Sequence, residues 1–163
     1  MAKSVAIVAG SYHKDKVEKM VKIVKSMSSE NNLLIEEISW VPGSMELPLQ
    51  VKRLLLRESI EGVIVLGIIE KGETDHGLVM GQAVTKSIID LQLLSMKPIG
   101  FGIIGPGAEE EQIDKRVEIH AKQAVIAVSE MLSNWISFLF SNYSFYIFLS
   151  YSGEHGRSLV EQK

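Results

Sequence analysis

The sequence predicts one α/β domain built around a parallel sheet. Four short runs rich in valine and isoleucine alternate with segments whose apolar residues recur at helical spacing. Runs that are apolar throughout are typical of strands buried on both faces, and strands that alternate with helices are typical of parallel sheets. The short connections between the segments agree with this arrangement.

The first half of the chain contains two strand and helix pairs. Residues 5–9 (VAIVA) form the first predicted strand, and residues 15–30 form a helix with lysines opposite its apolar face. Residues 33–41 (LLIEEISWV) form the second strand, which a Pro-Gly pair ends. A helix over residues 47–57 follows, and its proline is tolerated because it lies in the first turn.

The second half repeats the pattern. Residues 62–69 (GVIVLGII) are the clearest strand, and an amphipathic helix over residues 78–95 follows a polar turn. Residues 98–104 (PIGFGII) form the fourth strand. The last helix covers residues 109–133, and its glutamates lie in the first turn, where the helix dipole favours them.

The composition argues against nucleic-acid binding, membrane binding, a metal site and secretion. The 163 residues suffice for one domain with a real core, and the net charge of -3 offers no general attraction to nucleic acid or an anionic membrane. The chain has no cysteine, and its 4 histidines are scattered, so we expect no metal site. The N-terminal apolar run is too short for a signal peptide, and together with the lack of cysteine this favours a cytoplasmic location.

The candidate site follows from the predicted topology. In parallel α/β sheets, ligands bind where the carboxyl ends of the strands meet the loops. Those loops read GSYHKD, PGSMEL, EKGETDH and GPGAEEEQ in chain order. The GPG does not continue into GK[ST], and no GxGxxG follows the first strand, so the usual signatures of nucleotide cofactors are absent.

The EKGETDH loop is a candidate anion site. Gly72 lets a ligand approach the backbone closely, and the amides of Glu73 and Thr74 precede a helix, whose first turn favours an anion. The alternative is that Thr74 or Asp75 only caps the helix, which is the commoner role. His76 is either a proton donor or acceptor beside that anion or a surface histidine.

Four further side chains each have two interpretations. Glu46 either accepts hydrogen bonds from a polyol or amine or stabilises a helix start. Tyr12 either stacks on a planar ring or packs over the sheet edge. Phe101 belongs in the core unless it reaches across an interface, and Arg116 is solvated unless it completes a phosphate clamp.

The segments VPGSMELPL, LGIIEKGETDH, PIGFGIIGPG and EEEQIDKR, in this order, resemble the lumazine synthase (6,7-dimethyl-8-ribityllumazine synthase) family, and the GPG segment resembles its archaeal branch. The resemblance runs from about Val5 to Leu132. It implies a flavodoxin-like three-layer α/β/α sandwich with a central four-stranded parallel sheet. It also implies a homo-oligomer, either a pentamer or a pentamer-based cage, with sites at subunit interfaces.

The resemblance further implies a cofactor-free transferase of riboflavin biosynthesis. This enzyme condenses 5-amino-6-(D-ribitylamino)uracil with 3,4-dihydroxy-2-butanone 4-phosphate and releases phosphate and water. Two alternatives stay open: an archaeal-type riboflavin synthase, which we expect to lack the GETxH motif, and a non-catalytic shell or flavin-precursor carrier of the same fold.

By motif position, the resemblance also implies roles for individual residues. The residues implied to bind the ribitylamino-pyrimidine are Tyr12, Ser44, Met45, Glu46, Ile68, Ile69, Glu70 and Phe101. Those implied to bind the butanone phosphate are Glu73, Thr74 and Arg116. Tyr12 would stack on the pyrimidine, Glu46 would accept hydroxyl groups, and Glu70 would act through its backbone. Phe101 would enter from a neighbouring subunit, and His76 would transfer protons as the catalytic residue.

The resemblance does not extend to residues 133–163, so we expect a domain over residues 1–132 and a separate tail. Residues 135–151 (WISFLFSNYSFYIFLSY) contain 4 of the 5 phenylalanines of the chain. This segment could lie on or in a membrane, cover an oligomer surface or be extraneous to the fold. A membrane span is the least favoured, because 17 residues with four serines are at the lower limit of length.

Overall fold

The computed structural model describes the backbone of residues 2–154 and the side chains of residues 2–133. The strands are β1 (Lys3–Gly10), β2 (Leu33–Val41), β3 (Gly62–Glu70) and β4 (Ile99–Ala108). The helices are α1 (Lys14–Glu30), the 3-10 helix η1 (Ser44–Glu46), α2 (Leu47–Leu55), α3 (His76–Ser95) and α4 (Glu110–Glu154). By their contacts, the residues up to Leu132 form one unit, and residues 133–163 form another. The side chains of the aromatic segment 135–151 lie outside the described residues.

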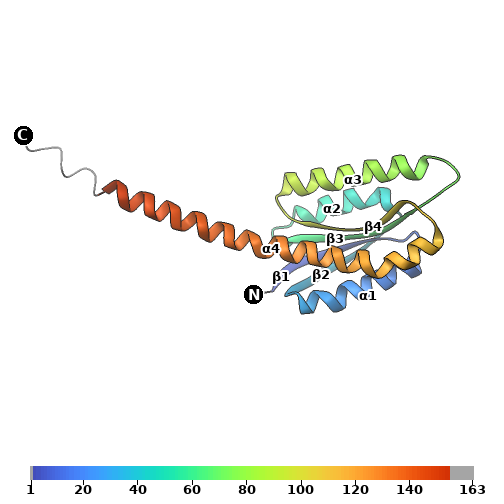
Figure 1. Ribbon diagram of the computed structural model, residues 1–163, viewed down its shortest axis with the longest axis horizontal. Helices are drawn as coiled ribbons and strands as arrows, with labels where there is room; N and C mark the ends of the chain where they lie inside the picture. The colour runs from blue at the N-terminus through green and yellow to red at the C-terminus, as the bar shows by residue number, and fades with distance from the viewer. Residues whose placement is uncertain (1, 155–163) are drawn as a thin grey trace, which may run out of the picture. The chain divides into compact units, whose positions relative to one another are not determined.

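The four strands form one parallel sheet in the order β2-β1-β3-β4. In Figure 1, α2 and α3 lie on one face of the sheet, and α1 and the first part of α4 lie on the other. The predicted α/β/α sandwich with a four-stranded parallel sheet is confirmed.

Strand β1 lies inside the sheet, which explains why its sequence is apolar throughout. Val5, Ile7 and Ala9 pack into the core beneath α1 and α4, whereas Ala6 and Val8 pack into the core beneath α2 and α3. All of these side chains are 0% exposed. Successive side chains of a strand point to opposite faces, so a strand covered by helices on both faces has no position left for a polar residue.

The fourth strand is longer than the sequence predicts. β4 includes the GPG segment, because Ala108 pairs with Glu70 after a shift in register. Gly105 has a φ of 99°, and a Cβ atom there would lie 2.0 Å from the carbonyl oxygen of Ile69. Only glycine, which has no Cβ atom, allows β3 and β4 to lie this close together at position 105. The prediction that GPG begins the loop after the fourth strand is therefore wrong, and α4 also continues beyond the predicted end at residue 133.

A lysine that is largely buried joins α1 to α4. The side chain of Lys16 is 8% exposed, and its Nζ lies 2.6 Å from Oδ1 of Asp114 and 3.0 Å from Oε1 of Glu110. The hydrogen bond to Asp114 is the main reason that the pKa of Lys16 is raised, and the same bond lowers the pKa of Asp114. The pair therefore stabilises the contact between the two helices while both groups are charged.

Asp114→Asn is expected to destabilise the chain in a pH-dependent way. Because the folded pKa of Asp114 is lowered, its contribution is complete above the ordinary aspartate pKa and is lost as the pH falls through the lowered value. Urea unfolding of wild type and variant at several pH values should give a stability difference at neutral pH that disappears in acid. Glu111→Gln removes an exposed carboxylate from the same helix and is the control. A difference that is independent of pH would contradict this assignment.

Candidate active site

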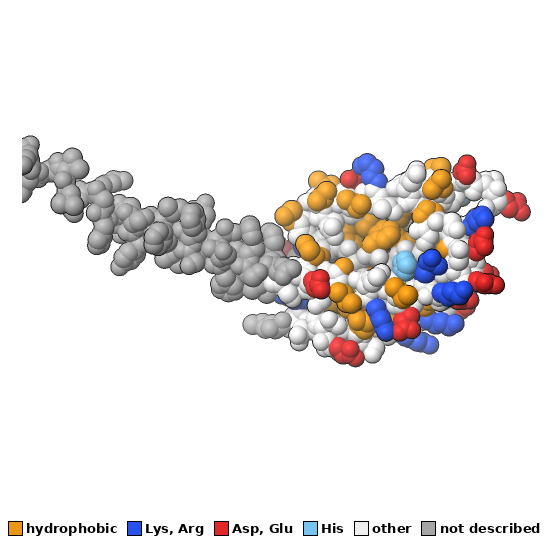
Figure 2. All heavy atoms as spheres, viewed as in Figure 1, with side chains coloured by type: hydrophobic (Ala, Val, Ile, Leu, Met, Phe, Trp, Pro, Cys, Tyr) orange, Lys and Arg blue, Asp and Glu red, His pale blue; other side chains and the backbone are white. Residues whose placement is uncertain are grey.

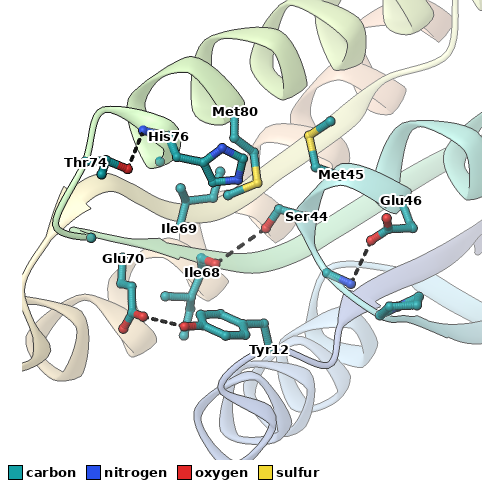
Figure 3. Close-up of a pocket in the computed structure, with 14 residues that line it drawn as sticks. Tyr12, Ser44, Met45, Glu46, Ile68, Ile69, Glu70, Thr74, His76 and Met80 are labelled. Carbon is teal, nitrogen blue, oxygen red and sulfur yellow. Dashed lines mark hydrogen bonds between the residues drawn. The ribbon is translucent and has the colours of Figure 1, made fainter.

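A cavity of about 430 Å³ opens at the carboxyl edge of the sheet, where the loop after β1, the turn at η1, the end of β3 and the start of α3 meet. Nine of the residues predicted from the sequence line this cavity: Tyr12, Ser44, Met45, Glu46, Ile68, Ile69, Glu70, Thr74 and His76. Figure 3 shows these residues arranged around one space. Of the four loops expected at this edge, the first three line the cavity, whereas the GPGAEEEQ segment does not.

The Glu70 carboxylate holds the aromatic residue of the first loop. The Tyr12 hydroxyl donates a hydrogen bond to Oε1 of Glu70, and the other oxygen, Oε2, lies 2.8 Å from Nε2 of His13. The hydrogen bonds from Tyr12 and then His13 lower the pKa of Glu70, and the bond to the carboxylate raises the pKa of Tyr12. Sequence reasoning assigned a role only to the backbone of Glu70, so this side-chain cluster was missed.

Glu46 closes the turn in which it lies. Its Oε2 accepts a 2.9 Å hydrogen bond from the amide of Gly43, which fixes the carboxylate at the cavity wall (Figure 3). Ser44 is buried behind it, and its hydroxyl lies 3.5 Å from the carbonyl oxygen of Ile68. A Cβ atom at Gly67 would lie 3.1 Å from the Ser44 hydroxyl, so glycine at this point of β3 lets the turn pack against the strand.

His76 is the first residue of α3, two residues earlier than the helix start predicted from the sequence. The Thr74 hydroxyl accepts a 3.4 Å hydrogen bond from the His76 amide, whereas Asp75 makes no side-chain cap. The weak cap is thus formed by Thr74. The imidazole is exposed and lines the cavity together with Met80, one helical turn further on. Sequence reasoning missed Met80, although its i+4 spacing from His76 is the signal that would have found it.

A smaller cavity of about 350 Å³ adjoins the same loop, and Glu73 and Thr74 line it. Gly72 lies in the open, because no atom lies within 4 Å of the position that its Cβ would take. Lys71 is paired with Glu109 at 2.9 Å, and this hydrogen bond raises the pKa of Lys71. The pairing largely offsets the lysine charge beside the loop.

Two predicted residues line neither cavity. Arg116 is exposed on α4, where its Nη1 donates a 3.0 Å hydrogen bond to the carbonyl oxygen of Gln112. Phe101 is partly buried and packs against the core beneath α2 and α3. Within one chain, therefore, neither side chain lines a cavity that the other predicted site residues line.

The described part of the chain contains neither a metal site nor a membrane-spanning helix. In that part of the chain, no three histidine or acidic side chains are grouped so that they could hold a metal ion. Within the same residues, none of the helices combines the length and apolar character that crossing a membrane requires.

An aromatic ring, a carboxylate and an imidazole line this cavity at the carboxyl edge of a parallel sheet, an arrangement typical of small-molecule sites in α/β enzymes. The model of the family described as 6,7-dimethyl-8-ribityllumazine synthase matches residues 2–135, and the chain belongs to this family.

Curated relatives carry the same name. The 6,7-dimethyl-8-ribityllumazine synthase of Staphylothermus marinus is 36% identical over 129 residues, which cover 79% of this chain and 86% of the relative. The Metallosphaera sedula protein of that name is 38% identical over 125 residues, covering 77% and 83%. The protein of Picrophilus torridus is 34% identical over 128 residues, covering 78% and 93%.

Proposed function

We propose that the protein condenses 5-amino-6-(D-ribitylamino)uracil with 3,4-dihydroxy-2-butanone 4-phosphate to 6,7-dimethyl-8-ribityllumazine in riboflavin biosynthesis. The observation that carries this proposal is that Tyr12, Glu46 and His76, from three separate loops, line one cavity. The reaction needs an aromatic surface for a planar ring, an acceptor for hydroxyl groups and a group that transfers protons, and the cavity offers one of each.

The pyrimidine side of the cavity is formed by β3 and η1. The backbone at the end of β3, from Ile68 to Glu70, offers N–H and C=O groups to the edge of the ring, while Tyr12 stacks on its face. Ser44, Met45 and Glu46 face the ribityl chain. The carboxylate of Glu46 keeps one oxygen for a hydroxyl donor, because only Oε2 is committed to the Gly43 amide in the turn.

The chemistry requires proton transfer and positioning. An amine of the pyrimidine condenses with the ketone to an imine with loss of water, and phosphate leaves by elimination. The second amine then closes the ring on the remaining carbonyl carbon with loss of a second water. The His76 imidazole can donate and accept the protons of these steps, because it lines the cavity next to the candidate phosphate loop. The phosphate oxygens can share this work, so no covalent nucleophile is needed.

In this proposal, a second copy of the chain completes the part of the site that binds the butanone phosphate. The loop amides near Glu73 and Thr74 supply donors, but Arg116 and Phe101 lie away from the cavity of their own chain. Exposed apolar side chains on α3, including Leu93 (65%) and Leu94 (84%), favour a helix covered by a partner. Figure 2 shows such side chains over the α3 side of the molecule. A homo-oligomer with shared sites, as a pentamer or a pentamer-based cage, would bring these parts together.

Arg116→Ala is expected to raise the KM for the butanone phosphate about tenfold, with a smaller change in the KM for the pyrimidine, because one charge-assisted hydrogen bond to phosphate is lost. Steady-state kinetics with each substrate varied in turn would measure both values. Lys115→Ala removes an adjacent positive charge from the same helix and is the matched control. Equal effects of the two variants would show that only the general charge of α4 matters.

The function itself is tested by following lumazine formation by absorbance with the full chain and both substrates. Product is expected only when both are present. A chain that binds the pyrimidine but forms no product would be a carrier or shell, and one that converts added lumazine to riboflavin would be a riboflavin synthase. A cytoplasmic location stays a prediction from the sequence.

A further inference from the structure

The proposed reaction uses the ring of Tyr12 but not the hydrogen bonds that hold it, which join the side chains of Tyr12, His13 and Glu70 in one cluster. Both oxygens of the Glu70 carboxylate are engaged, Oε1 by the Tyr12 hydroxyl and Oε2 by Nε2 of His13 at 2.8 Å. The rings of Tyr12 and His13 meet edge to face, with centroids 4.7 Å apart and an interplanar angle of 76°. The ring of Tyr12 is thus held by its hydroxyl at one end and by a neighbouring ring at its side.

The two ends of this cluster lie in different kinds of structure, an exposed loop and a paired strand. Tyr12 lies in the loop between β1 and α1 and is 51% exposed, so packing alone would leave its ring several orientations. Glu70 is the last residue of β3, and the sheet fixes its backbone by pairing it with Ala108. His13 has a φ of 53°, a left-handed conformation that directs the chain into α1. The carboxylate therefore joins an exposed residue of a loop to a residue whose backbone is paired in the sheet.

We propose that the Glu70 side chain is a positioning residue that holds the Tyr12 ring in the orientation needed to stack on the pyrimidine. It acts through Tyr12 and not by touching the substrate, because Tyr12 and His13 occupy both of its oxygens. A ring that is already oriented loses less conformational entropy when the substrate binds, so the contact is expected to strengthen pyrimidine binding. This inference rests on the proposed function.

The contact can be tested without any substrate by titrating the Tyr12 phenol. The chain has 4 tyrosines, so replacing Tyr143, Tyr146 and Tyr151 by phenylalanine in the full chain leaves Tyr12 as the only one. Tyrosinate absorbance should then show a pKa above the ordinary tyrosine value, because the phenol donates to a carboxylate. Glu70→Gln should return the pKa towards the ordinary value, whereas Glu18→Gln, an exposed carboxylate on α1, should not. An unshifted Tyr12 in the parent chain would overturn the proposal.

Kinetics test whether Glu70 acts through Tyr12. Glu70→Leu and Tyr12→Phe are each expected to raise the KM for the pyrimidine about fivefold, because each removes the same hydrogen bond. Neither variant should change the KM for the butanone phosphate, and Glu70→Gln, which keeps an acceptor, should recover most of the affinity. The double variant should be no worse than either single one, since both break one interaction.

The opposite pattern would refute the inference. If the two effects multiply to about 25-fold, Glu70 contributes to binding independently of Tyr12. If the wild-type chain forms no lumazine, the proposed function fails, but the phenol titration still decides whether Glu70 holds Tyr12. The two failures are therefore distinguishable.

Discussion

His76→Ala is expected to lower kcat for lumazine formation about 10- to 100-fold and to leave the KM for the pyrimidine nearly unchanged. The imidazole lines the cavity at the first residue of α3, where it can reach the groups that gain and lose protons. This loss lies at or below the lower limit of about 100-fold that is usual for a general acid or base, because the oxygens of the departing phosphate can carry some of the protons.

Steady-state kinetics and thermal unfolding together check this prediction. The His76 side chain is exposed, so its removal should leave the unfolding temperature unchanged and separate chemistry from folding. Val79→Ala, three residues further along α3 and 62% exposed, is the control for a change on the same helix. A large rise in KM with an unchanged kcat would instead make His76 a binding residue.

Gly100→Ala is expected to destabilise the domain by about 3 kcal/mol or to prevent folding, which makes it the largest predicted effect on stability. A Cβ atom at Gly100 would lie 2.2 Å from the carbonyl oxygen of Ala124 and 2.9 Å from Cγ2 of Val128. The first of these is backbone of α4, so no side-chain rotation can relieve the overlap and the helix must move away from β4.

Urea unfolding of the full chain would measure the change, with Gly72→Ala as the control. No atom lies within 4 Å of the Cβ position at Gly72, so the same chemical change is expected to cost little there. If Gly100→Ala were as stable as Gly72→Ala, α4 would not lie as close to β4 as the structure indicates.

The sequence alone determined the order of the elements and which loops gather at one edge of the sheet. Valine and isoleucine runs that alternate with helical periodicity indicated a parallel sheet, and in a parallel sheet the loops that carry Tyr12, Glu46 and His76 must gather at one edge. These inferences succeed because they depend on local patterns and on connectivity. The motif resemblance supplied the chemistry that spacing by itself left open, since capping and anion binding use the same residue types.

Only the tertiary structure decided which side chains meet across long separations. Tyr12 and Glu70 are 58 residues apart, and no local pattern indicates that their side chains bond. The local sequence gives no reason for a glycine at position 100, whereas the structure shows that the backbone of α4 lies where a Cβ atom would be. Arg116 and Phe101 lie away from the cavity of their own chain, because the faces of α4 and β4 to which they belong do not line it. Contacts of this kind depend on register, rotamer and the packing of whole layers, which a linear pattern does not encode.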